Sequence, residues 1–111
     1  MTTTNGKDGK LTVIEGLATL NPQTGDTPRI EKLASGTGAT VIRISFTAGQ
    51  TMADHQAMFP ILVQTVVGDI SFGTEEQTVS LVPGTAVHVD AGIVHRLYAN
   101  IDSVVMLTIL R

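Results

Sequence analysis

Apolar and polar residues alternate with a period of two along much of this chain, which is the pattern of a β-strand with one buried face. The alternation is cleanest over residues 40–47, where Ile42, Ile44 and Phe46 share one face and polar residues occupy the other. No segment combines the apolar period of an amphipathic helix with capping residues. We therefore expect an all-β chain in which helices are minor or absent.

Turn residues divide the chain into short runs that each fit one strand. The predicted strands cover residues 11–20, 29–33, 40–47, 60–67, 70–72, 77–82, 85–89, 94–99 and 104–110. The pair Gly68-Asp69 separates two of these runs and predicts a hairpin with its turn at that point. Short strands at this even spacing are typical of a β-sandwich or a β-barrel.

Two of the predicted strands, 61–67 and 104–110, are apolar on both faces. One face of each must enter the core, and the other also needs cover because a large exposed apolar patch is unusual on a monomer. A homodimer joined through a sheet face about a two-fold axis would supply that cover. The alternative is that both strands are packed between two sheets of one chain.

Length and composition narrow the class of protein further. A chain of 111 residues fits a single domain, and we expect a disordered leader over residues 1–10 and a barrel domain over residues 11–111. Seven basic and ten acidic residues give a formal charge of −3 without a basic stripe, so nucleic-acid binding is not expected. The absence of cysteine excludes disulfides and thiolate metal sites.

The N-terminus and the hydropathy of the chain bear on its location. The first residues are polar and lack the apolar core of a signal peptide, and no run is long enough to form a membrane-spanning helix. These features predict a cytoplasmic protein with no membrane partner.

Three histidines, His55, His88 and His95, are the side chains best suited to chemistry in an all-β pocket. The spacing around two of them resembles the two sequence motifs of the cupin superfamily. The first motif is formed by Gly49, His55 and Gly68, and the second by Gly84, Asp90-Ala91-Gly92, His95 and Asn100. Together these residues span positions 49–100, about half of the chain, at the spacing of a small single-domain cupin. The resemblance implies a cupin-type β-barrel, or jelly roll.

The resemblance also implies where a metal would be held. In metal-binding cupins the first motif supplies two histidines separated by one residue and a carboxylate four positions later, and the second motif supplies a third histidine. His55 and His95 occupy the first and last of these positions, whereas Ala57 and Ile61 stand at the other two. Neither alanine nor isoleucine can donate an electron pair, so the metal motif is degenerate. His88 is the best candidate for a further ligand.

Two functions follow from this reading. The first is a module that binds a small organic ligand in a barrel pocket bounded by His55, Ala57, Ile61, His95 and Leu97. The alternative is a small enzyme. With a divalent Fe, Mn, Ni, Cu or Zn ion on the histidines it would resemble the cupin dioxygenases, isomerases and lyases, and without metal one histidine would act as general base. Both functions require that the imidazoles of residues 55 and 95 converge in one enclosed cavity.

Overall fold

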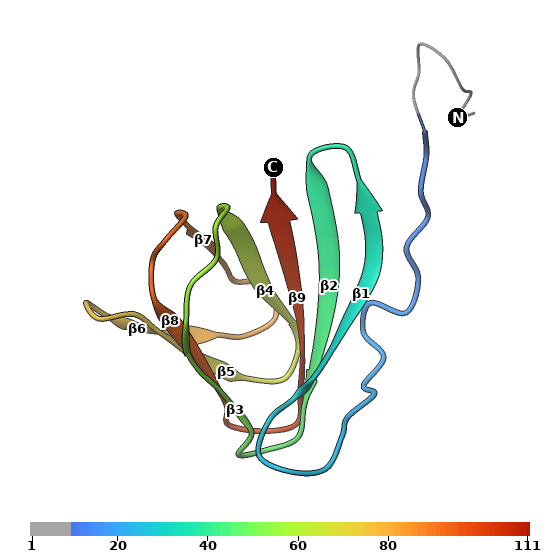
Figure 1. Cartoon of the computed structure of the whole chain (residues 1–111). Helices are drawn as coiled ribbons and strands as arrows, with labels where there is room; N and C mark the ends of the chain where they lie inside the picture. Colours follow the sequence, from blue (N-terminus) through green and yellow to red (C-terminus); the bar gives the residue numbers. More distant parts are fainter. Residues whose placement is uncertain (1–9) are drawn as a thin grey trace.

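A computed structural model describes residues 10–111 of the chain, and these residues form nine β-strands and no helix (Figure 1). The strands are β1 (Arg29–Gly36), β2 (Ala39–Phe46), β3 (Thr51–His55), β4 (Ile61–Val67), β5 (Ile70–Gly73), β6 (Thr78–Leu81), β7 (Ala86–Val89), β8 (His95–Ala99) and β9 (Ser103–Leu110). The predicted leader lies outside the described residues except for Lys10. Among residues 10–111, no helix is long and apolar enough to span a membrane.

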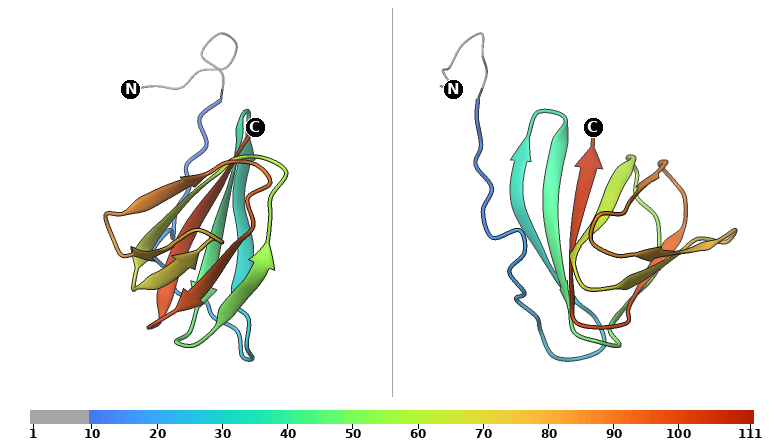
Figure 2. Two further views of the ribbon diagram at one scale, coloured as in Figure 1. Left: turned by 90° about the vertical axis from the view of Figure 1, so that its left-hand side faces the viewer. Right: turned by 180° about the vertical axis from the view of Figure 1, so that it is seen from behind.

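The strands form two antiparallel sheets that face each other across the core (Figures 1 and 2). One sheet has five strands in the order β1-β2-β9-β4-β7, and the other has four in the order β3-β8-β5-β6. Inward residues from both sheets form the core, among them Ile44, Phe46, Val63, Phe72 and Leu97. The prediction of an all-β barrel or jelly roll is therefore confirmed, and so is the apolar face of β2.

The predicted hairpin at Gly68-Asp69 is wrong, because β4 and β5 belong to different sheets and do not pair. The chain instead turns a corner between the two layers. Gly68 adopts a positive φ of 101°, and the Asp69 amide donates a hydrogen bond of 3.0 Å to Ser103 Oγ at the start of β9. A short turn joins adjacent strands or neighbouring sheets equally well, so local sequence does not distinguish the two.

The predicted strand over residues 11–20 is also wrong, because this N-terminal segment is extended and exposed without pairing to a sheet. It runs outside the five-stranded sheet, as Figures 1 and 2 show in blue. The segment and Asn21, which follows it, bond through their backbone to side chains of β2: Arg43 Nη1 donates to the Gly16 carbonyl at 2.6 Å, and the Asn21 amide donates to Ser45 Oγ at 3.0 Å. Because of this cover, the polar face of β2 is buried, with Arg43 only 8% exposed.

The two strands that are apolar on both faces differ in how their outer faces are covered. Strand β9 lies at the centre of its sheet, and Val104 and Met106 are buried within the single chain. On β4 the outer side chains Leu62 and Val66 are half-buried, and Val67 at its end is 44% exposed. The apolar outer face of β9 thus needs no second chain to cover it, and the homodimer stays a prediction.

Candidate functional site

The structure brings His55 and His95 together inside the barrel. The two residues are direct partners across the β3–β8 pair, and their ring centroids lie 4.3 Å apart with the rings at 62° to each other. Strand β3 departs from regular pairing between Met52 and His55, and the irregularity lets both of these side chains line the same cavity. The two imidazoles therefore come from different strands and share one wall.

The cavity beside the two imidazoles has a volume of about 260 Å³ and lies between the inner faces of the two sheets. Apart from the two histidines, every side chain that lines it is apolar. The lining residues are Ile30, Ile42, Ile44, Met52, His55, Ala57, Ile61, His95, Leu107 and Ile109. Such a wall favours an apolar guest, while the imidazoles supply a few oriented polar atoms.

The structure places the predicted pocket residues as follows. His55, Ala57, Ile61 and His95 line the cavity together. Leu97 does not, and its inclusion is a correction: it is fully buried in the core, paired with Met52 and Phe72 on the flanking strands. Leu97 shares a face of β8 with His95, but it packs in the core and does not border the cavity. Strand parity gives the shared face and does not give which residues of that face border the cavity.

His88, the predicted extra ligand, does not join the imidazole pair. On β7 the side chains of Val87 and Val89 turn toward the core, so His88 between them faces outward. Its side chain is 54% exposed, and its Nδ1 lies 3.8 Å from Asp90 Oδ1. The prediction of His88 as a metal ligand is therefore corrected.

The donor set does not fit a catalytic metal ion of the kind that the cupin resemblance implies. Such sites hold zinc or another first-row ion with about three protein donors and keep one position open. Within residues 10–111, no three His, Asp or Glu side chains are grouped so that they could hold a metal. The cavity offers two imidazoles, with Ala57 and Ile61 where the remaining donors would stand.

His95 is fixed in one orientation. Its Nδ1 lies 2.9 Å from the carbonyl oxygen of Ile93, and Phe72 stacks on its ring at a centroid distance of 5.5 Å. The residue is 1% exposed, and its Nε2 is buried without a hydrogen-bond partner in the part of the chain that the structure describes. Burial lowers the pKa of His95, the neighbouring His55 lowers it further, and the bond to Ile93 opposes the shift. His95 is therefore neutral at pH 7.

The lowered pKa of His95 predicts that stability falls on mild acidification. Between the folded-state pKa and the unfolded value near 6.5, the unfolded chain binds more protons, so the free energy of unfolding rises with pH in this window. The contribution is complete above about pH 6.5 and is lost as the pH falls toward the folded-state pKa. Urea unfolding between pH 7 and 5 measures it, and the variant His95→Phe should show a smaller loss. An equal loss in both proteins would assign the effect to other groups.

The opposite face of the β3–β8 pair is polar and solvent-facing. Asp54 Oδ1 accepts a hydrogen bond from Arg96 Nε at 2.8 Å, so the residues adjacent to the two histidines pair outside the barrel. The hydrogen bond from Arg96 holds the pKa of Asp54 below its usual value. Asp54 is thus excluded as a donor to the cavity, as strand parity predicts.

Sequence reasoning missed most of the cavity wall. The missed residues are Ile30, Ile42, Ile44, Met52, Leu107 and Ile109. The period-two pattern did identify Ile42 and Ile44 as an inward face. The pattern does not reveal the long-range pairing of β1, β2 and β9, which places these isoleucines opposite the histidine pair.

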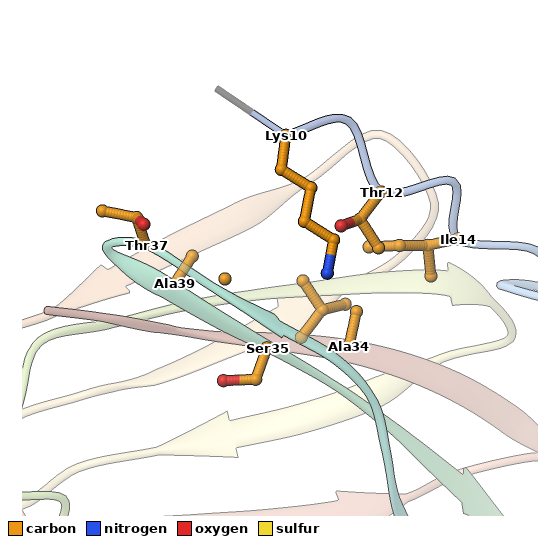
Figure 3. A pocket seen from close by; sticks show the side chains of 9 residues that line it. Lys10, Thr12, Ile14, Ala34, Ser35, Thr37 and Ala39 are labelled. Atoms are coloured by element: carbon orange, nitrogen blue, oxygen red, sulfur yellow. The ribbon is translucent and has the colours of Figure 1, made fainter. Parts of the chain in front are cut away.

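A larger cleft of about 640 Å³ lies outside the barrel, between the N-terminal segment and the β1–β2 hairpin (Figure 3). Lys10 extends its side chain into this cleft from the segment, and Ala34, Ser35 and Thr37 line it from the hairpin. None of the described residues that line it is a histidine or a carboxylate. The smaller inner cavity, which holds the imidazole pair, is the candidate site.

Comparison with known proteins identifies the fold. No protein-family model matches the chain, and no curated protein matches it. Solved structures do match. A cupin superfamily protein from Desulfitobacterium hafniense is 16% identical with a TM-score of 0.72, and the match covers 89% of this chain and 98% of that one.

Two further solved structures give the same result. KdgF from a Halomonas species is 21% identical, with a TM-score of 0.70 and coverage of 82% of this chain and 86% of that one. A conserved protein with a double-stranded β-helix domain from Klebsiella pneumoniae is 15% identical, with a TM-score of 0.73 and coverage of 82% of both chains. At such low identity the likeness establishes the fold alone, and this chain is a small protein of the cupin fold.

Proposed function

We propose that this small cupin-fold protein binds a small, uncharged and largely apolar organic molecule in the cavity beside His55 and His95. The observation that carries the proposal is the composition of the wall, in which two imidazole rings are the only polar groups that the described residues place among isoleucine, leucine, methionine and alanine side chains. Transfer of apolar surface from water into such a wall is favourable, whereas a charged group would lose its hydration without a compensating partner.

The size of the cavity limits the ligand. At about 260 Å³ it lies between the cavity of about 150 Å³ that accepts benzene in an engineered protein and the sites of about 300 Å³ or more that hold drug-sized molecules. A single substituted ring or a short branched chain fits this range. Ile30, at the edge of the wall, is 55% exposed, so the cavity has a route to solvent.

The metal-dependent enzyme is the competing function, and its requirement is a tight metal site. Two imidazoles chelate a divalent ion weakly, so we expect purified protein to carry little metal and its melting temperature to respond little to added Zn²⁺, Fe²⁺, Mn²⁺, Ni²⁺ or Cu²⁺. Near-stoichiometric metal that disappears in a His55→Ala/His95→Ala variant would favour the enzyme instead.

The binding proposal is tested by filling the cavity. Ala57 lines the wall, so Ala57→Phe should occupy the space that a ligand needs. Ala48→Phe is the matched control, because Ala48 is exposed in the turn after β2 and lies outside the cavity. Toluene serves as the probe, and its affinity is measured by calorimetry and by the shift in melting temperature.

We expect wild-type protein and Ala48→Phe to bind toluene with a Kd of about 0.1–0.5 mM. At about ten times that concentration, binding adds roughly 1.4 kcal/mol of stability, which raises Tm by about 5 °C. Ala57→Phe should bind at least about tenfold more weakly and show little shift. Equal binding by all three proteins would place the ligand elsewhere, and no saturable binding to the wild type would reject the proposal.

A further inference from the structure

We propose that His95 Nε2 is a hydrogen-bond acceptor that selects ligands carrying an uncharged hydroxyl or N–H donor, so that the cavity prefers a phenol-like molecule to a hydrocarbon of the same shape. The inference rests on the proposed function and names the chemical class of its ligand. It makes His95 a specificity-determining residue in a site without metal.

The position of the proton on His95 follows from its contact with the backbone. A carbonyl oxygen can only accept a hydrogen bond, so the 2.9 Å contact with the Ile93 carbonyl requires the hydrogen to be on Nδ1. A neutral imidazole has a single N–H, which leaves a lone pair on Nε2. That lone pair is buried and has no hydrogen-bond partner among residues 10–111.

An unpartnered buried acceptor is unfavourable, and most buried polar atoms in proteins are satisfied. His95 is 1% exposed and lines the cavity, so a ligand donor placed in the cavity can supply the missing bond. The stacked Phe72 ring and the bond to Ile93 hold the imidazole in place. The imidazole is therefore preorganised, which lowers the entropic cost of binding a donor.

His55 reinforces the same preference. Its Nδ1 lies 3.0 Å from the Ala53 carbonyl, which can only accept a hydrogen bond, so the tautomer that makes this bond has its hydrogen on Nδ1 and an acceptor at Nε2. The remaining wall is apolar. A carboxylate entering the cavity would find no hydrogen-bond donor, whereas a hydroxyl group would find two acceptors on neighbouring rings.

The test compares phenol, toluene and benzoate on the wild-type protein and on His95→Phe, which keeps a ring stacked on Phe72 and removes the acceptor. We expect the wild type to bind phenol at least as tightly as toluene, although the hydroxyl must lose its hydration, and to bind benzoate at least about tenfold more weakly. His95→Phe should weaken phenol about five- to tenfold while leaving toluene within about twofold.

A measurement on the wild type alone keeps the inference testable where the variant fails to fold. Long-range ¹H–¹⁵N NMR reports which imidazole nitrogen carries the hydrogen, and we expect the Nδ1–H form for His95, with a change at Nε2 when phenol is added and none with toluene. An Nε2–H form would overturn the inference. Toluene binding that is blocked by Ala57→Phe, together with a phenol affinity that His95→Phe leaves unchanged, would overturn it while leaving the proposed function intact. Absence of binding by either probe would reject both.

Discussion

Replacing Gly68 with alanine is expected to destabilise the protein by more than about 3 kcal/mol, enough to leave much of it unfolded at 37 °C. Two effects act together at this corner between β4 and β5. The backbone of Gly68 has a φ of 101°, a conformation that residues with a Cβ rarely adopt. A Cβ there would also overlap Ser103 Oγ and lie 2.5 Å from the Asp102 carbonyl oxygen, so β9 would have to move.

Gly84→Ala separates the steric effect from the backbone strain. Gly84 has a nearly equal φ of 96°, but a Cβ there would meet nothing within 4 Å. We expect this variant to lose only about 1–2 kcal/mol from the left-handed conformation. Urea unfolding of both variants measures the difference. Equal destabilisation by the two substitutions would show that contact with β9 contributes nothing to the corner.

The same corner shows what the sequence could and could not predict about the fold. Period-two alternation gave the inward face of β2 and most strand positions, because side-chain direction is a local property of an extended chain. It could not tell whether Gly68-Asp69 joins two strands of one sheet or two sheets. That choice depends on Ser103, which is 34 residues away from Asp69 and accepts its amide hydrogen.

The N-terminal segment illustrates a second limit. Residues 11–20 contain apolar residues at strand-like spacing, yet Leu11 and Val13 are 61% and 72% exposed. The Gly16 carbonyl of this segment accepts a hydrogen bond from Arg43, and the amide of Asn21, just after the segment, donates one to Ser45. Both side chains lie on the outer face of β2, so hydrogen bonds with polar side chains replace a strand ladder. Burial of these side chains could not be predicted, because polar residues on an alternating strand normally face water.

For the candidate site, motif spacing gave the two histidines and the two apolar replacements. The pairing of His55 with His95 requires β3 and β8 to be neighbouring strands. The resemblance of the motif spacing to cupins implied this arrangement, whereas the pattern of apolar and polar residues did not. Leu97 was misplaced because a residue that shares a face of β8 with His95 need not border the cavity. The isoleucines of β1, β2 and β9 were missed because their approach to the histidines is set by long-range pairing.

Restoring the two absent donors is expected to create a metal site. In the double variant Ala57→His/Ile61→Glu, both substituted positions lie in the wall that already holds His55 and His95, so the cavity would present three imidazoles and one carboxylate. We expect the affinity for Zn²⁺ or Ni²⁺ to rise by at least about a hundredfold over the wild type, as measured by calorimetry. Removing His55 from the double variant, with His55→Ala, should abolish most of that gain.

The same variant links metal binding to stability and tests why the site has its present composition. Ile61 is 1% exposed, so an unpaired glutamate there is expected to destabilise the metal-free protein by several kcal/mol. Added metal should restore the melting temperature, because an ion that binds only the folded state stabilises it by mass action. The double variant should also lose toluene binding, since the new side chains fill the cavity and make its wall polar. If the wild type binds metal tightly and the double variant binds it with the same affinity, the two imidazoles are sufficient to hold the ion. The cavity would then be a metal centre, and the proposal of an apolar ligand would be rejected.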